Sequence, residues 1–383
     1  MNIAVKSVTT AAAVAAVICL SVTASARTSE ASTASSSFKA PGAIALDHSG
    51  DLWVANEDTW GITEIQASSG KVLRLVNAKA DGFLDPYGIA VSGNEVWIVS
   101  GGVTTANGKS NYGMVTELNA ADGDLVRTVN LQQLGITGLT AVSAIGNEVW
   151  IAADGGEQVV VLSAATGRVE HLYRGRVDYA EPGGIATGDR QVWIPSPEGN
   201  SAVVVRNAAS GREIRAITLS RRERPRGGGP KAPTYLGPEY VSIDAHYAWT
   251  GNEASVSLKL HSGSVTQFDV ATGKVVRTID TAADRFWGTI KSIVSDGVHV
   301  WIVNGTASFG NRKVGDTVTE LNATNGSLVR VIQLSKSVYS NPVGIAVNGT
   351  DVWVTDAGGG YEGLPSVIEL SASTGAVVKR IGG

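Results

Sequence analysis

Short apolar segments alternate with polar turns along most of the chain, and one pattern returns seven times. Its clearest copy is Pro86-Tyr-Gly-Ile-Ala-Val-Ser-Gly-Asn-Glu-Val-Trp97-Ile-Val, in which a strand of small residues leads through a Gly-Asn turn to a strand with a tryptophan. The tryptophans of the seven copies are Trp53, Trp97, Trp150, Trp193, Trp249, Trp301 and Trp353. Their steps of 43 to 56 residues are typical of repeat architectures.

A second phrase follows each tryptophan after a variable gap and has the form strand, Ala-x-x-Gly turn, strand. Its glycines are Gly70, Gly123, Gly167, Gly211, Gly273, Gly326 and Gly375. Each unit therefore has four strands, rich in Val and Ile and without helical periodicity. We predict an all-β fold, a seven-bladed β-propeller of four-stranded antiparallel blades, because a ring of blades buries both apolar faces of each sheet.

The repeat also sets the limits of the blades. We expect them at residues 41–76, 86–131, 138–173, 182–219, 238–279, 289–334 and 342–381. The tryptophans are predicted to pack between neighbouring blades. The last blade has its own fourth strand, Val377 to Ile381, so the ring is expected to close by a simple meeting of blades one and seven.

The N-terminal segment has the pattern of a secretory signal peptide over residues 1–26. Lys6 precedes an apolar run too short to span a bilayer, and Ala24-Ser-Ala26 is a cleavage site. An uncleaved anchor is the alternative. Residues 27–40 are predicted to be a flexible linker, followed by the propeller at 41–383. Cleavage after Ala26 would give a secreted protein with no cysteine, hence no disulfide and no thiolate metal site.

The charge of the chain excludes some partners. A net charge of -4 gives no bulk attraction to nucleic acid, and no later segment is long enough for a membrane span. The basic run Arg221 to Lys231 has no interleaved aromatic residues. It is interpreted as a solvated crossing between blades, with anion binding as the alternative.

The two faces of the predicted disc differ in their loops. Turns between the first and second strands, and between the third and fourth, lie on one face and are short. The remaining connections lie on the other face, which we name the long-loop face. Long loops on a rigid scaffold are where binding residues belong, so we expect a protein, glycan or small-molecule ligand there, bound by a monomer.

Two sets of side chains are candidates for that face. The first could form an aromatic platform, or simply support the loops, and comprises Trp60, Tyr87, Tyr179, Tyr240, Trp287 and Tyr339. The second set consists of carboxylates three or four residues after the repeated tryptophan, namely Glu57, Asp154, Glu253 and Asp356. Arranged around one axis they could hold Ca²⁺ or Mg²⁺, or alternatively cap the strand ends.

The phrase Gly-Ile-Ala-x-x-Gly-Asn-x-Val-Trp-Ile, with Leu-Asn-x-x-x-Gly-x-Val-Val-Arg-x-Ile after it, resembles the repeats of NHL and YVTN propellers over residues 41–383. Those are modules of interaction or unknown function. The phrase is also similar to that of the streptogramin B lyase (virginiamycin B lyase) group, which implies a metal-assisted elimination with a histidine base. Of the five histidines only His261 falls in a loop of the long-loop face. The resemblance therefore implies His261 as base and Glu253 as metal contact.

Three functions remain open at this point. The first is a secreted binding or interaction module that uses the long-loop face. The second is a metal-dependent enzyme similar to the streptogramin B lyases. The third is a structural component of the cell envelope or wall without a discrete ligand. The matching residues are packing and turn residues, which specify a fold more than an activity.

Overall fold

The computed structural model describes residues 38–59, 61–77, 85–101, 113–131, 134–174, 181–197, 202–219, 236–254, 263–280, 289–305, 307–309, 312–334, 340–358 and 364–382. The chain divides into two compact units, Met1–Ser32 and Thr33–Gly383. The first unit lies outside the described residues, and so does the predicted signal peptide. The second unit contains all of the described strands.

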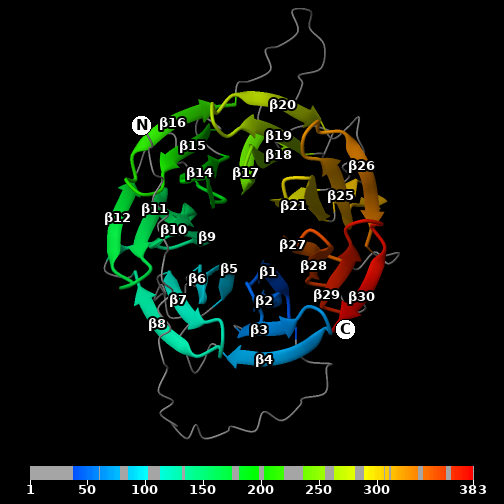
Figure 1. Cartoon of the computed structure of the whole chain (residues 1–383), viewed down its shortest axis with the longest axis horizontal. Helices are drawn as coiled ribbons and strands as arrows, with labels where there is room; N and C mark the ends of the chain where they lie inside the picture. Colours follow the sequence, from blue (N-terminus) through cyan, green and yellow to red (C-terminus); the bar gives the residue numbers. More distant parts are fainter. Residues whose placement is uncertain are drawn as a thin grey trace, which may run out of the picture. The chain divides into compact units, whose positions relative to one another are not determined.

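Seven antiparallel sheets of four strands form the seven predicted blades, each with its strands in chain order. Figure 1 shows the first strand of each blade near the centre and the fourth on the outside. Blades one to three are β1 (Pro41–Leu46), β2 (Asp51–Asn56), β3 (Gly61–Gln66), β4 (Lys71–Asn77); β5 (Pro86–Ser92), β6 (Glu95–Ser100), β7 (Met114–Asn119), β8 (Leu125–Asn130); and β9 (Leu139–Ile145), β10 (Glu148–Ala153), β11 (Gln158–Ser163), β12 (Val169–Arg174).

The other four blades follow the same plan. They are β13 (Ala186–Gly188), β14 (Gln191–Ser196), β15 (Ala202–Asn207), β16 (Glu213–Thr218); β17 (Leu236–Ile243), β18 (Tyr247–Ala254), β19 (Ser264–Asp269), β20 (Val275–Asp280); β21 (Thr289–Ser295), β22 (His299–Gly305), β25 (Thr317–Asn322), β26 (Leu328–Gln333); and β27 (Pro342–Val347), β28 (Asp351–Asp356), β29 (Ser366–Ser371), β30 (Val377–Ile381). The predicted fold class is confirmed.

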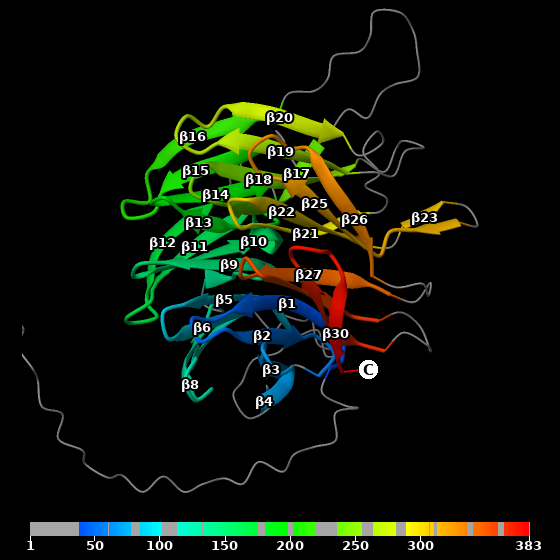
Figure 2. The ribbon, with the colours of Figure 1, turned by 45° about the vertical axis from the view of Figure 1, so that its right-hand side comes forward.

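Two short elements interrupt the connections between second and third strands. The hairpin of β23 (Ala307–Phe309) and β24 (Arg312–Val314) lies between β22 and β25, and Figure 2 shows β23 projecting beyond the blades. A 3₁₀ turn, η3 (Asp154–Gly156), joins β10 to β11. Within the described residues, no helix has the length and apolar character needed to cross a membrane.

The repeated tryptophans pack between blades, as predicted. All seven are among the largest fully buried side chains of the described residues. Trp97 on β6 belongs to a cluster with Val149 and Ile151 of blade three, and Trp353 on β28 belongs to one with Leu52 and Val54 of blade one. Each indole therefore fills the space between its own sheet and the next.

The ring closes by packing of blade seven on blade one, with no strand exchanged between them. The Thr355 hydroxyl donates a 2.6 Å hydrogen bond to the Gly42 carbonyl across this junction. Phe38 is 6% exposed and packs in the same junction with Ile44 and Ile381. The apolar core thus begins three residues before the predicted start of the propeller at residue 41, because one aromatic side chain is buried there. Residues 38–40 add no strand.

A cation on the fourth strand links several blades to the next one through a backbone carbonyl in the third–fourth turn. These contacts measure 3.0 to 3.2 Å and join Arg74 to Ala121, Arg127 to Ala165, Arg215 to Ala271, Arg330 to Ser373 and Lys379 to Ala67. The turn glycine makes room for the cation. Gly123 has φ +74°, and a Cβ there would lie 2.5 Å from Arg74 Cδ. Lys379 makes the same link at the closing junction.

In four blades the same cation also pairs with a carboxylate on its own third strand. The pairs are Arg74–Glu64, Arg127–Glu117, Arg330–Glu320 and Lys379–Glu369, at 2.6 to 3.0 Å. Glu64 is 2% exposed, and burial raises its pKa to about 7 against the attraction of Arg74, with the nearby charges of Asp51 and Asp47 adding to the rise. The buried carboxylate is therefore a source of pH-dependent stability.

We expect Glu64→Gln to change the pH dependence of folding. The folded pKa lies above the unfolded one, so the cost of burying the charge is absent below about pH 4.5 and complete above about pH 7. The stability of the wild type, relative to Glu64→Gln, should therefore fall by about 3 kcal/mol as the pH rises through this window. Urea unfolding at several pH values measures it. Glu170→Gln, an exposed position, is the control, and parallel profiles for Glu64→Gln and wild type would contradict the expectation.

Candidate functional site

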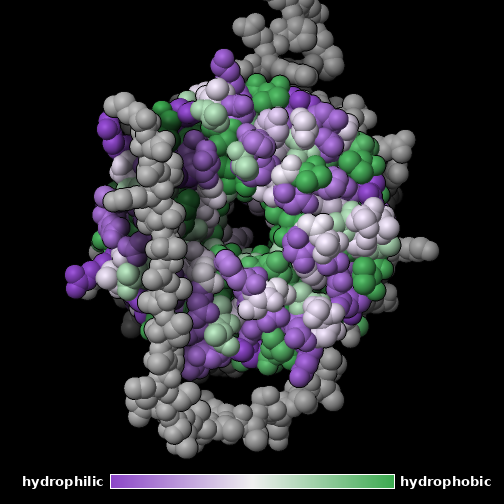
Figure 3. Space-filling model, viewed as in Figure 1, coloured by the Kyte–Doolittle hydropathy of each residue, from purple (hydrophilic) through white to green (hydrophobic). Residues whose placement is uncertain are grey.

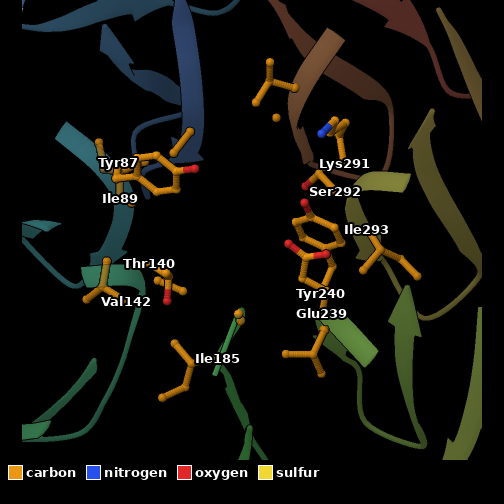
Figure 4. Close-up of a pocket in the computed structure, with 18 of the residues that line it drawn as sticks. Tyr87, Ile89, Thr140, Val142, Ile185, Glu239, Tyr240, Lys291, Ser292 and Ile293 are labelled. Atoms are coloured by element: carbon orange, nitrogen blue, oxygen red, sulfur yellow. The ribbon is translucent and has the colours of Figure 1, made fainter. Parts of the chain in front are cut away.

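A cavity of about 600 Å³ lies at the centre of the ring, and all seven blades contribute to its wall. Figure 3 shows the central opening, and Figure 4 shows the side chains around it. Its deeper wall comes from the first strands of the blades and from the segment before β13. Three of its acidic residues come from connections of the long-loop face, with Glu57 and Asp154 after second strands and Glu181 before a first strand. The cavity therefore opens toward that face.

Small residues allow the first strands to approach one another around this cavity. A Cβ at Gly344 of β27 would lie 2.5 Å from the Gly42 carbonyl oxygen of β1. At Gly184, before β13, a Cβ would lie 2.6 Å from the Glu239 carbonyl oxygen of β17. The glycine of the repeated Gly-Ile-Ala phrase is thus explained by close packing of inner strands.

A β-bulge recurs where first strands reach the mouth of the cavity. The pairing of β5 with β6 passes from Pro86–Ser100 to Gly88–Val99 and skips Tyr87. In the same way the register skips Thr140 in β9, Glu239 in β17 and Lys291 in β21. Bulges re-aim side chains and are frequent beside functional sites. All four bulge residues line the cavity (Figure 4). The bulges therefore direct these side chains toward the cavity.

Acidic groups dominate the charge of the cavity. Glu57, Asp154, Glu181 and Glu239 line it, and Lys291 is the one basic side chain among its described lining residues. Burial raises the pKa of Glu57, and the neighbouring Asp85 and Asp58 raise it further. Charges of like sign therefore lie close together around Glu57 and make its carboxyl harder to ionise.

Two further groups show how the carboxylates converge. Burial raises the pKa of Asp154, partly offset by hydrogen bonds from backbone N–H groups. Burial also raises the pKa of the Tyr87 hydroxyl, and Glu57, Glu239, Asp154 and Asp85 add to the rise. Tyr87 thus lies within electrostatic range of carboxylates from several blades, and its hydroxyl keeps its proton at neutral pH.

The structure describes two of the six aromatic residues of the predicted platform. Tyr87 and Tyr240 both line the cavity, and Figure 4 shows them on opposite sides of it. Trp60, Tyr179, Trp287 and Tyr339 lie outside the described residues, as does His261. Glu253 is in β18, where its backbone pairs with Gly237, and its side chain is outside the description.

The predicted metal ligands separate into two structural positions. Glu57 and Asp154, four residues after their tryptophans, line the cavity. Asp356, three residues after Trp353, is buried and accepts hydrogen bonds from Ser340 Oγ, the Asn341 N–H and the Gly358 N–H at 2.7 to 3.0 Å. Asp356 therefore holds the loops around the end of β28, the alternative role considered for this set.

The described residues contain one group of three acidic side chains close enough to share a metal ion. It comprises Asp47, Asp51 and Glu64, with ligand atoms within 4.8 Å of one another. None of the three lines the central cavity. Asp47 accepts hydrogen bonds from the Trp53 indole and two backbone N–H groups, and Glu64 is paired with Arg74. These carboxylates serve the packing of blade one.

The sequence did not predict three charged residues of the cavity, Glu181, Glu239 and Lys291. A proline at the entrance of a first strand marks the positions of the first two. Glu239 follows Pro238 as Tyr87 follows Pro86, at the entrance of a first strand, and Glu181 precedes the equivalent Pro182. Lys291 has no such marker, because blade six begins without a proline. Its position becomes apparent only from the bulge that it shares with Tyr87 and Glu239.

The seven blades and their shared central cavity define the chain as a seven-bladed β-propeller. Its fold is similar to that of virginiamycin B lyase from Staphylococcus aureus, whose crystal structure superposes with a TM-score of 0.59. The similarity covers 82% of this chain and 91% of that one, at 15% sequence identity, and is a similarity of fold. No family model and no curated protein matches the sequence.

Proposed function

We propose that the protein is a binding module that takes a small-molecule ligand, or a side group of a larger partner, in the central cavity at the long-loop face. The recurring bulge carries this proposal. It turns Tyr87, Thr140, Glu239 and Lys291 from four blades into one cavity of about 600 Å³. That volume is in the range of ligand pockets, which combine an apolar wall with a few converging polar groups. The N-terminal sequence pattern supports a secreted location for this activity.

A lyase is the second candidate, and the fold similarity to virginiamycin B lyase is the observation that favours it. This candidate requires His261 as base and Glu253 as a metal contact. Glu57 and Asp154 would be the described residues available to a Ca²⁺ or Mg²⁺ ion in the cavity. The described lining residues alone do not form a group of three close ligands, so they do not support a metal-dependent step without help from other residues.

A ligand screen by thermal unfolding tests the binding proposal. The panel contains cationic, neutral and anionic small molecules, simple sugars, and Ca²⁺ and Mg²⁺ with EDTA reversal. The purified protein is compared with Ser292→Trp, which places an indole in the cavity, and with Thr324→Trp on an exposed turn of β25–β26. A ligand at a hundredfold excess over its Kd stabilises the folded state by about 2.7 kcal/mol.

We expect at least one panel member to raise the melting temperature of the wild type and of Thr324→Trp but not of Ser292→Trp. The two variants should melt alike without ligand. Binding in the cavity would be contradicted if no panel member raised the melting temperature of any of the three proteins, or if every effective member raised all three equally. A metal-dependent rise reversed by EDTA would instead favour the lyase candidate.

A further inference from the structure

The charge of the cavity is strongly one-sided. Its described lining has carboxylates from Glu57, Asp154, Glu181 and Glu239, contributed from blade one, blade three, the segment before blade four, and blade five. Lys291 alone opposes them among those residues. Low-dielectric walls focus the field of such a cluster, so the cavity attracts cations and excludes anions.

Aromatic rings lie among these carboxylates. Tyr87 is 51% exposed and projects from the bulge of β5. Tyr240 of β17 lies on the opposite side of the cavity and is also partly packed against the core between blades five and six (Figure 4). Ile89, Val142, Ile185 and Ile293 form apolar wall between them. The face of a tyrosine ring attracts a cation held within about 6 Å, and this attraction grows when the site is shielded from water.

We infer that the cavity binds an organic cation, an alkylammonium or quaternary ammonium group placed between Tyr87 and Tyr240 and neutralised by the surrounding carboxylates. This inference rests on the proposed function. An organic cation fits the site better than a metal ion, which needs several oxygen ligands at close range. The described lining residues form no such group, whereas they do combine two tyrosine side chains, apolar wall and distributed negative charge.

Two neighbouring bulges allow the charge to be tested in both directions. Glu239 of blade five and Lys291 of blade six occupy equivalent positions, each skipped by the register at the same point of its first strand. A cationic ligand is attracted by the Glu239 carboxylate and repelled by the Lys291 ammonium group. Glu239→Gln should therefore weaken binding, and Lys291→Met should strengthen it. A purely structural role of these residues would not produce effects of opposite sign.

Isothermal titration calorimetry with a matched pair of probes tests the inference. Acetylcholine is compared with 3,3-dimethylbutyl acetate, in which carbon replaces the charged nitrogen and the shape is kept. We expect acetylcholine to bind the purified protein at least about tenfold more tightly than its uncharged counterpart. Raising the ionic strength from about 0.01 M to about 0.15 M should weaken acetylcholine binding only.

The variants locate the site. Tyr87→Ala should weaken acetylcholine binding by about tenfold, since one ring of the pair is lost. Glu239→Gln should weaken it, Lys291→Met should strengthen it, and Glu170→Gln on the exposed face of β12 should leave it unchanged. Equal binding of both probes would overturn the inference, and so would acetylcholine binding that none of the cavity variants alters.

The remaining outcomes separate this inference from the proposed function. If neither probe binds but the ligand screen yields a neutral or anionic molecule lost in Ser292→Trp, the cavity is a binding site and the cation inference is wrong. If neither probe binds and the screen is empty, both fail. A Mg²⁺ or Ca²⁺ effect without acetylcholine binding would also overturn the inference, because it assigns the charge to a metal site.

Discussion

Replacing Trp97 with alanine is expected to lower the free energy of unfolding by about 5 kcal/mol, the upper end for loss of a buried aromatic side chain. The indole is fully buried between blades two and three, where it packs with Val149 and Ile151. Its Nε1 donates a 3.2 Å hydrogen bond to Glu95. The cavity left behind would lie between two sheets, and neither can collapse into it without breaking its own strand pairing.

Urea unfolding followed by circular dichroism measures this loss. Trp97→Phe keeps an aromatic ring in the space and should retain much of the stability. Tyr87→Ala removes a ring of the same blade that is half exposed, and should change stability by less than about 1 kcal/mol. If Trp97→Ala and Tyr87→Ala had similar effects, the tryptophans would not be the main contacts between blades.

The second large effect is expected at the closing junction. Phe38→Ala should lower the free energy of unfolding by about 4 kcal/mol, because the ring is buried against Ile44, Ile65 and Ile381. A Cβ at Gly382 would lie 2.4 Å from the Phe38 ring, so the last described residue of the propeller also touches it. One side chain therefore ties both ends of the blade sequence together.

Thermal and urea unfolding of Phe38→Ala measure the contribution of this contact. Lys39→Ala, the adjacent exposed position, is the matched control and should behave as wild type. Phe38→Leu should recover part of the loss, since it restores apolar volume. Equal stability of Phe38→Ala and Lys39→Ala would mean that the junction depends on Thr355 and Lys379 without the aromatic ring.

The fold could be predicted from the sequence because each of its rules is local and is repeated seven times. Alternating apolar strands, a Gly-Asn or Ala-x-x-Gly turn, and a buried tryptophan specify one blade, and repetition specifies the ring. The predicted blade limits lie within four residues of the observed strand ends, as where β13 begins at Ala186 and the prediction at Pro182. Phe38 escaped detection because it stands alone in a Ser-rich segment, outside any repeat.

The site was harder to predict because it depends on which way single side chains point. Asp356 is the last residue of β28, whereas Glu57 and Asp154 lie one residue beyond the ends of β2 and β10. Glu57 and Asp154 stand four residues after their tryptophans and line the cavity, whereas Asp356 stands three residues after Trp353 and is buried inside its blade. The predicted set of metal ligands combined these two positions. Asn56, three residues after Trp53, is buried like Asp356 and hydrogen-bonds Thr63.

The recurring bulge has a consequence for how such a protein can diversify. The register of the first strands skips Tyr87, Thr140, Glu239 and Lys291, so the backbone pairing on either side does not include these four residues. The Thr140 side chain is linked to the scaffold, since its hydroxyl donates hydrogen bonds to the carbonyls of Ala152 and Pro182. Under the binding function proposed above, a point mutation at one of these four positions would change the lining of the cavity while the strand pairing of the blade stays in place. Under that function, sequence change at the bulges would alter ligand preference at a smaller cost in stability than change at the buried tryptophans between the blades.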